Sequence, residues 1–348
     1  MSRALAILSL LGIAACSSPE PSDSTPARPE LPSVTRWFYY LDVNLDDGTL
    51  QKITTSTYDM VVMDPIVTEQ ENQDYPIGET VAGLHAAEHP KLVFAYIDVG
   101  QAEDYRTYWQ PDWQIGDPDW ITAVDPDGWE GNYPCAYWRP EWKAIWLGAG
   151  GYMDQILAAG FDGVYLDWIE AYSDENVLAA AAADGVDAKA EMLKWIGEIG
   201  DYGRARDPRF LVIAQNAAEL ALEPGYSSLV DAIAQEQVWF DGAADNDPPG
   251  DCPLPATEAD VDTAAYADSL SPGCRQTYDD YPDSTLHVST ESYLDALAAA
   301  EARGLLIFTV DYALEPDHVD HVYREARERG FVPFAGSRAL NAYIEPVP

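Results

Sequence analysis

Residues 160–167 read Gly-Phe-Asp-Gly-Val-Tyr-Leu-Asp. The leading glycine follows a stretch with helical spacing, and a glycine at that place is typical of a helix end. The short apolar run after it, rich in branched and aromatic residues, predicts a β-strand. Asp167 ends that run, so the segment predicts a helix, a strand and an acidic strand tip in that order.

The same alternation of strand and helix repeats from residue 35 onward. Eight runs predict strands, at residues 35–42, 58–64, 91–99, 161–168, 209–216, 232–239, 304–311 and 331–334. Helical spacing is clearest at residues 152–159, 188–206, 292–303 and 319–329. Eight strand–helix units predict an α/β fold, the (β/α)8 or TIM barrel. A doubly wound open sheet is the competing architecture, but it usually has a Gly-rich loop after its first strand, and Asp42-Val43-Asn44-Leu45 offers none.

The composition excludes two classes of protein. With 19 Lys and Arg against 60 Asp and Glu, the formal net charge is −41. The 11 Trp, 21 Tyr and 8 Phe are far more aromatic surface than an acidic disordered chain carries. Nucleic acid is excluded as a partner, because phosphates are bound by Lys and Arg. The charge suits a cationic ligand, or equally a salty habitat.

The N-terminus predicts export. Arg3 and an apolar run over residues 4–15, too short to span a bilayer, indicate that residues 1–15 are a signal peptide. Ile13-Ala14-Ala15-Cys16 resembles the lipobox of bacterial lipoproteins, which would place a lipid on Cys16; a plain secretory signal is the alternative. Residues 16–34 are rich in Ser and Pro and predict a disordered tether.

The expected location follows from these segments. Residues 35–348 are then a single barrel domain held at a membrane through the lipid on Cys16. Asp does not follow Cys16, which in a Gram-negative cell favours the outer membrane or the cell surface.

The remaining cysteines predict one disulfide. In an exported protein, Cys252 and Cys274 bracket a segment rich in Pro, Asp and Gly and are expected to pair, for about 3 kcal/mol on chain-entropy estimates. Cys135 is left over. There is no Cys-x-x-Cys pair, and His318-x-x-His321 is interpreted as the solvated start of a charged helix. The sequence therefore predicts no metal site and no cofactor.

Polar residues stand at the tips of seven predicted strands. They are Asp42, Asp64, Asp98, Asp167, Asn216, Glu236 and Asp311. In a TIM barrel these tips surround the active face, so they predict a ring of carboxylates at one mouth. A single acid at a strand end is ordinarily a helix N-cap, and the ring rather than any one member indicates a site.

Asp167 and Glu236 are the candidate catalytic pair. They end the fourth and sixth strands, which contribute inward side chains to one layer. Two carboxylates across a pocket suit glycoside cleavage, one as nucleophile or base and the other as the acid that protonates the leaving oxygen. Ala232, Ile233 and Ala234 precede Glu236, and this apolar setting predicts a raised pKa for Glu236.

Two longer motifs resemble a known family. Residues 96–106 read Tyr-Ile-Asp-Val-Gly-Gln-Ala-Glu-Asp-Tyr-Arg, followed by Tyr108-Trp109. This stretch resembles the signature after strand 3 of glycoside hydrolase family 114, the endo-α-1,4-polygalactosaminidases, and residues 160–167 resemble strand 4 of the same family. The likeness continues through Gln215-Asn216, Gln235-Glu236, Thr309-Val310-Asp311-Tyr312 and Pro333-Phe334, over most of residues 35–343.

The resemblance implies a retaining endo-glycosidase that hydrolyses α-1,4-linked, galactosamine-rich exopolysaccharide. It makes Asp167 the nucleophile and Glu236 the general acid/base. Together with the strand tips, it gives the candidate substrate-binding residues Asp42, Asp64, Tyr96, Asp98, Glu103, Tyr165, Asn216, Asp311 and Tyr312. The ammonium of a deacetylated galactosamine unit would bind the carboxylate ring through charge-assisted hydrogen bonds.

Two further expectations concern the molecule as a whole. Residues 241–283 form an enlarged loop after the sixth strand, which would overhang the cleft and influence substrate length. We expect a monomer. The alternative function is that of a non-catalytic or accessory lipoprotein at the cell surface that binds polysaccharide in the same cleft.

Overall fold

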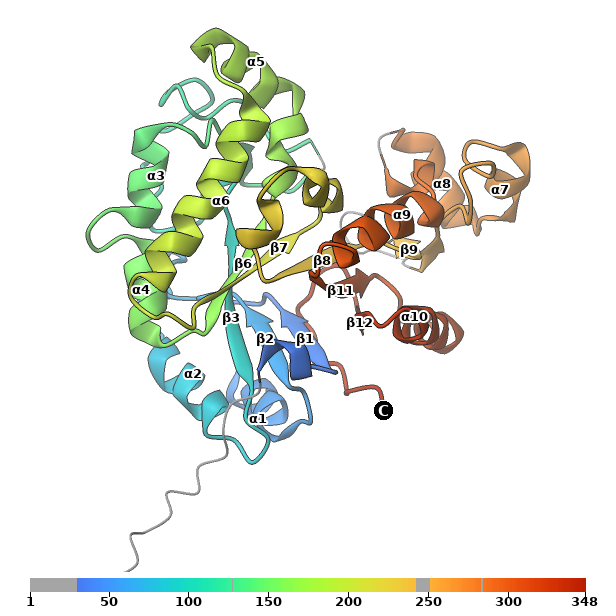
Figure 1. The fold of residues 1–348 in the computed structure, drawn as a ribbon, viewed down its shortest axis with the longest axis horizontal. Coiled ribbons are helices and arrows are strands. Elements are labelled where there is room, and N and C mark those ends of the chain that lie inside the picture. The colour runs from blue at the N-terminus through green and yellow to red at the C-terminus, as the bar shows by residue number, and fades with distance from the viewer. Residues whose placement is uncertain (1–29, 127, 242–250, 283) are drawn as a thin grey trace, which may run out of the picture.

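The computed structural model describes residues 30–126, 128–241, 251–282 and 284–348 (Figure 1). The expected signal peptide, Cys16 and most of the expected tether lie outside these ranges. At the start of the described chain, Leu31–Ser33 form a 3-10 turn, and Leu31 and Val34 are buried. The packed domain therefore includes residues before the expected boundary at residue 35. None of the described helices is both long enough and apolar enough to cross a membrane.

Eight parallel strands form one sheet, which confirms the predicted barrel. In spatial order they are β1 (Trp37–Tyr40), β2 (Met60–Met63), β3 (Leu92–Asp98), β6 (Gly163–Asp167), β7 (Leu211–Gln215), β8 (Ala232–Glu236), β11 (Leu306–Asp311) and β12 (Val332–Ala335). Each strand lies within a predicted run or within one residue of it. The Trp37 indole nitrogen donates to the Val332 carbonyl at 3.0 Å and links the first strand to the last.

Helices cover the outside of most strand connections. They are α1 (Asp47–Thr55), α2 (Ile77–His85), α3 (Pro140–Leu147), α4 (Tyr152–Ala159), α5 (Glu175–Asp184), α6 (Ala188–Arg204), α9 (Thr290–Glu301) and α10 (Pro316–Glu328). The connection from β7 to β8 is different, because it holds the 3-10 turns η3 (Ala218–Leu222) and η4 (Tyr226–Ser228) in place of an α-helix. At β6, a side chain on Gly163 would meet the Leu211 carbonyl at 2.3 Å, so the approach of β7 requires a glycine there.

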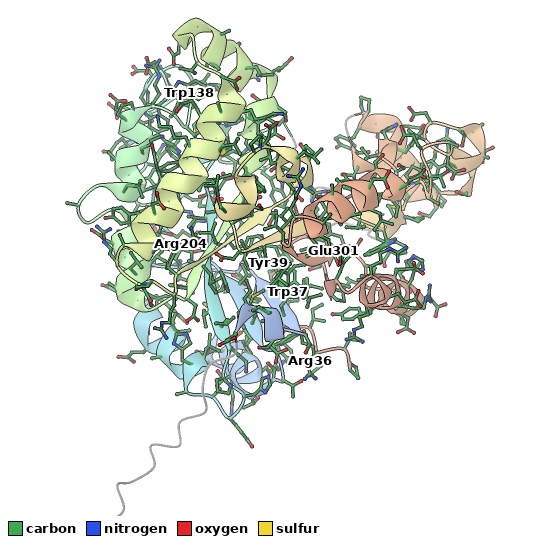
Figure 2. The ribbon with its side chains drawn as sticks, in the orientation of Figure 1. Arg36, Trp37, Tyr39, Trp138, Arg204 and Glu301 are labelled. Carbon is green, nitrogen blue, oxygen red and sulfur yellow. A yellow bond between two sulfur atoms is a disulfide. The ribbon has the colours of Figure 1, made fainter. Side chains whose placement is uncertain are left out.

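Aromatic side chains fill the barrel. Trp37 and Tyr39, labelled on β1 in Figure 2, are almost fully buried. The Trp37 ring lies 5.6 Å from that of Phe308, and the Tyr39 ring 5.0 Å from that of Tyr165, measured between ring centroids. The interior is therefore a packed core, as expected for a TIM barrel, and Tyr39 also lines the cavity at the ends of the strands.

The described part of the enlarged loop after β8, with the residues that follow it, forms a small subdomain, here called the cap and defined as the described residues 251–282 and 284–289. It contains β10 (Cys252–Pro253), α7 (Ala264–Ser269), α8 (Pro272–Asp280) and η5 (Thr285–His287), and β10 pairs with β9 (Phe240–Asp241). The predicted disulfide between Cys252 and Cys274 is present, with a Cα–Cα distance of 5.4 Å, inside a small apolar core of its own. Figure 1 shows α7 and α8 at one end of the molecule, far from α3 and α4.

Candidate active site

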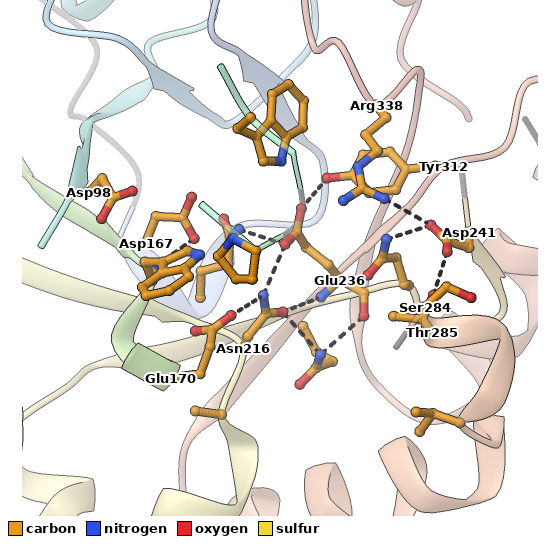
Figure 3. A pocket seen from close by; sticks show the side chains of 18 of the residues that line it. Asp98, Asp167, Glu170, Asn216, Glu236, Asp241, Ser284, Thr285, Tyr312 and Arg338 are labelled. Carbon is orange, nitrogen blue, oxygen red and sulfur yellow. Dashed lines mark hydrogen bonds and ion pairs between the residues drawn. The ribbon is translucent and has the colours of Figure 1, made fainter. Parts of the chain in front are cut away.

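A cavity of about 760 Å³ opens at the C-terminal ends of the strands (Figure 3). Strand tips and the residues beside them form its floor: Tyr96, Asp98, Asp167, Asn216, Glu236 and Tyr312. All six belong to the predicted site, so the structure brings together both candidate catalytic residues and four candidate substrate-binding residues. Thr277, Tyr281 and Thr285 of the cap line the same cavity, which confirms that the enlarged loop reaches the cleft.

Asp167 is held by one donor on each carboxylate oxygen. The Tyr96 hydroxyl donates to Oδ2 at 2.6 Å, and the backbone N–H of Trp168 donates to Oδ1 at 2.7 Å. Trp168 has a φ of 55°, so the chain turns sharply out of the strand directly after the acid. Burial, and then the charge of Glu236, raise the pKa of Asp167 to about 7. The two carboxyl groups therefore interact across the cavity.

Glu236 lies in a polar setting. Its Oε2 accepts from Gln215 Nε2 at 2.6 Å and from Asn216 Nδ2 at 3.0 Å, and its Oε1 accepts from the Tyr312 hydroxyl. The expectation of an apolar setting for Glu236 is therefore wrong. The residues before Glu236 on its own strand are apolar, but they do not surround its carboxylate. Polar side chains at the ends of β7 and β11 surround it instead.

Asp98 lies next to Asp167, since β3 and β6 pair these two residues in register. Its Oδ1 accepts the backbone N–H groups of Gly100 at 3.0 Å and Gln101 at 2.7 Å. Burial, and then the charge of Asp167, raise the pKa of Asp98 well above its usual range. A side chain on Gly100 would meet the Trp168 carbonyl at 2.2 Å, so the turn after β3 fits against the turn after β6 only with glycine.

Two predicted substrate-binding residues lie behind the cavity wall. Asp64 and Glu103 are buried and both pair with Arg106, at 2.8 Å each. Neither belongs to the cavity lining. The sequence does contain a signal for this ion cluster. Arg106 lies three residues after Glu103, and a buried acid is usually paired with a basic residue.

Three more predicted site residues also lie outside the lining. Asp42 accepts from the backbone N–H of Asn44 at 2.8 Å, and Tyr165 is buried beneath Tyr39. Asp311 accepts the backbone N–H groups of Trp239 at 2.7 Å and Phe240 at 2.9 Å. Burial raises the pKa of Asp311 to about 7. Asp311 thus fixes the chain after β8 and supports the wall.

Several lining residues were not predicted. They are Trp129, Glu170, Gln215, Glu219, Asp241, Tyr281 and Arg338. Gln215 precedes a predicted tip and could have been found from the strand end. Arg338 Nη1 pairs with Asp241 Oδ1 at 3.2 Å and its guanidinium lies 5.6 Å from the Tyr312 ring centroid. Nothing in the local sequence around residue 338 indicates these long-range contacts.

The chemistry of the site defines a class of enzyme. A TIM barrel with two interacting carboxyl groups at the mouth of its strands has the arrangement of a glycoside hydrolase. The comparisons agree: the chain belongs to glycoside hydrolase family GH114, whose family model matches residues 18–346. An uncharacterized protein of Deinococcus radiodurans is 32% identical over 97% of both chains. An uncharacterized protein of Methanocaldococcus jannaschii is 34% identical over 59% of this chain and 57% of its own.

Solved structures show the same fold. The glycoside hydrolase domain of PelA from Pseudomonas aeruginosa is similar with a TM-score of 0.57 and 18% identity, over 90% of this chain and 98% of that domain. Aspergillus fumigatus Ega3, solved in complex with galactosamine, is similar with a TM-score of 0.55 and 16% identity, over 93% of this chain and 98% of its own.

Proposed function

We propose that the protein is a retaining endo-glycosidase that hydrolyses α-1,4-linked, galactosamine-rich polysaccharide. The observation that carries this proposal is the pair Asp167 and Glu236, which line one cavity and interact strongly enough for the charge of Glu236 to raise the pKa of Asp167. Membership of the family supports the reaction. The galactosamine bound to the related structure supports the sugar.

In the proposed mechanism, Asp167 attacks the anomeric carbon while Glu236 protonates the departing oxygen. Water then enters, Glu236 removes its proton, and the bond to Asp167 breaks. The Tyr96 hydroxyl and the Trp168 N–H fix both oxygens of Asp167, which leaves its carboxylate little freedom to rotate. Gln215 and Asn216 position Glu236 from β7. Burial and the charge of Glu236 raise the pKa of Asp167 to about 7 in the free protein, and a cation bound beside Asp167 would favour its ionised, nucleophilic form.

The charge of the cavity favours a cationic polymer. Its lining contains Asp98, Glu130, Asp167, Glu170, Glu219, Glu236 and Asp241, and Arg338 is its only Lys or Arg within the described ranges. Arg338 is paired with Asp241, so its charge is largely compensated. Ammonium groups along a deacetylated polysaccharide would find carboxylates at several places in this cavity, whereas an anionic polymer would be repelled.

The test is the release of reducing ends from galactosamine oligomers. We expect activity in the wild type, and a loss of about a thousandfold or more in Asp167→Asn and Glu236→Gln, because each removes one half of the acid–nucleophile pair. Oligomer binding should survive in both variants. If the wild type binds the oligomer and releases no ends at any pH, the protein is an accessory polysaccharide-binding protein instead.

We also propose that the chain is exported, with residues 1–15 removed and a lipid on Cys16 that anchors a monomer in the cell envelope. The disulfide of the cap supports an oxidising compartment. Partition of the expressed protein into a detergent phase, lost in Cys16→Ser, would test the anchor. Retention in that phase by the variant would exclude a lipid on Cys16.

A further inference from the structure

Glu170 has an unusual place in the cavity wall. It lies in η2 (Ile169–Ser173), one helical turn after Asp167, and lines the cavity. Its Oε1 accepts from Asn216 Nδ2 at 3.1 Å, and the same amide nitrogen donates to Glu236. Figure 3 shows Glu170 and Glu236 on the two sides of Asn216. Glu170 and the proposed acid/base Glu236 thus share one hydrogen-bond donor, the side-chain amide of Asn216.

The second oxygen of Glu170 has no partner. Oε2 is buried, and no group in the described part of the chain donates a hydrogen bond to it. An unpaired buried carboxylate oxygen costs free energy, and a protonated one would leave its hydroxyl without an acceptor. Burial, and then the charge of Asp167, raise the pKa of Glu170 to about 8. A cation placed in the cavity would remove this penalty.

Most other acids near this site are hydrogen-bonded or paired, and Asp311, whose buried Oδ2 also has no partner among the described residues, lies outside the cavity lining. Glu219 accepts from the Tyr172 hydroxyl at 2.5 Å, and Asp98 accepts two backbone N–H groups. Asp64 and Glu103 pair with Arg106. Within the described ranges, no Lys or Arg is paired with Glu170, and an unsatisfied group in a ligand cavity calls for a specific explanation.

We propose that Glu170 binds the ammonium of the galactosamine unit that occupies the cavity beside Asp167, and so sets a preference for deacetylated over N-acetylated sugar. The inference rests on the proposed function and deepens it. Glu170 lines the cavity, and the last side-chain bond of a glutamate is a soft torsion, so a small rotation of its carboxylate toward a bound ammonium costs little. An ammonium there would donate a charge-assisted hydrogen bond, which an uncharged acetamide cannot replace in strength.

The position of Glu170 also couples recognition of the ammonium to the proposed cleavage step. An ammonium between Glu170 and Asp167 would offset the charges of both, and a nearby cation favours the ionised form of a carboxyl group. Asp167 would then be ionised when the correct sugar is bound. The unit that is bound tightly is thus also the unit that is cleaved.

The experiment compares Glu170→Gln with Glu223→Gln, at an acid that pairs with Lys189 at 3.3 Å and does not line the cavity. Glu170→Gln keeps an oxygen for the Asn216 amide and removes only the charge, so folding should be preserved, which the unfolding temperature checks. We expect the ratio of kcat/KM on galactosamine oligomers to that on N-acetylgalactosamine oligomers to fall at least tenfold in Glu170→Gln. Glu223→Gln, which removes the same charge outside the cavity, should leave this ratio within twofold of the wild type. An unchanged ratio in Glu170→Gln would overturn the proposal.

A binding measurement separates this inference from the proposed function. Galactosamine and N-acetylgalactosamine monosaccharides cannot be cleaved, so calorimetry reports recognition alone. We expect Glu170→Gln to weaken galactosamine binding at least tenfold and to leave N-acetylgalactosamine binding within twofold. A wild type that cleaves no oligomer but shows this pattern would refute the proposed function and retain the inference. Equal binding of galactosamine by wild type and Glu170→Gln would refute the inference in either case.

Discussion

Individual side chains determine how the site works, and Asp167 illustrates this best. Its carboxylate accepts a hydrogen bond on each oxygen, which favours the charged form, yet burial and Glu236 together outweigh them and raise its pKa to about 7. The charged form of Asp167 is therefore poorly stabilised in the free protein. A positive charge bound beside Asp167 would stabilise that form.

The raised pKa predicts how Asp167 affects stability. The folded protein retains a proton on Asp167 up to about pH 7, whereas the unfolded chain loses it near pH 4, so stability falls as the pH rises through that interval. We expect Asp167→Asn to increase the free energy of unfolding by on the order of 2 kcal/mol at pH 8, with a smaller gain at pH 5.5. Urea unfolding at both values measures it. A variant less stable than the wild type at pH 8 would contradict the raised pKa.

Among the larger elements, the cap distinguishes this barrel. It folds around its own apolar core and connects to the barrel rim through Asp241, which accepts from Thr285 Oγ1 at 2.6 Å and pairs with Arg338. The Tyr281 side chain is 60% exposed and the Trp129 side chain 42% exposed, and both line the cavity. Exposed rings in a sugar cleft are suited to stacking on sugar faces. The cap therefore extends the cleft beyond Asp167 and Glu236.

Removal of the cap disulfide should affect long substrates selectively. The bond closes a loop with a sequence separation of 22, and its loss in the Cys252→Ser/Cys274→Ser variant should destabilise the protein by up to about 3 kcal/mol. We expect KM for the polymer to rise at least threefold while kcat on short oligomers stays within twofold. Kinetics on both substrates measure this. Equal changes in KM on short and long substrates would show that the cap does not contribute to binding of the polymer.

The sequence predicts the strands well because each is a short apolar run that ends in a polar residue. It predicts the cavity less completely. The sequence positions of Asp64 and Glu103 predict site residues, but both are buried in ion pairs with Arg106. Glu170 lies in a 3-10 turn without periodicity, and Arg338 contacts partners far away in the chain. These placements depend on contacts between loops, which local patterns do not encode.

For the whole molecule, the net charge of −41 and the acidic lining of the cavity both favour a cationic ligand. The surface charge is equally expected of a protein adapted to salt, so it does not identify the substrate by itself. The identity of the reaction depends instead on the two carboxylates at the tips of β6 and β8. In the proposed mechanism, the barrel holds them across one cavity, so that a covalent sugar intermediate forms on Asp167 and is released by water.

The most direct test of the proposed retaining mechanism is the anomeric configuration of the first product. Proton NMR of freshly cleaved galactosamine oligomers reports the anomer before mutarotation mixes the two forms. Attack by Asp167 followed by attack of water inverts the anomeric carbon twice, so we predict the α anomer as the initial product. An initial β anomer would mean a single displacement by water, and Asp167 would then not be the nucleophile.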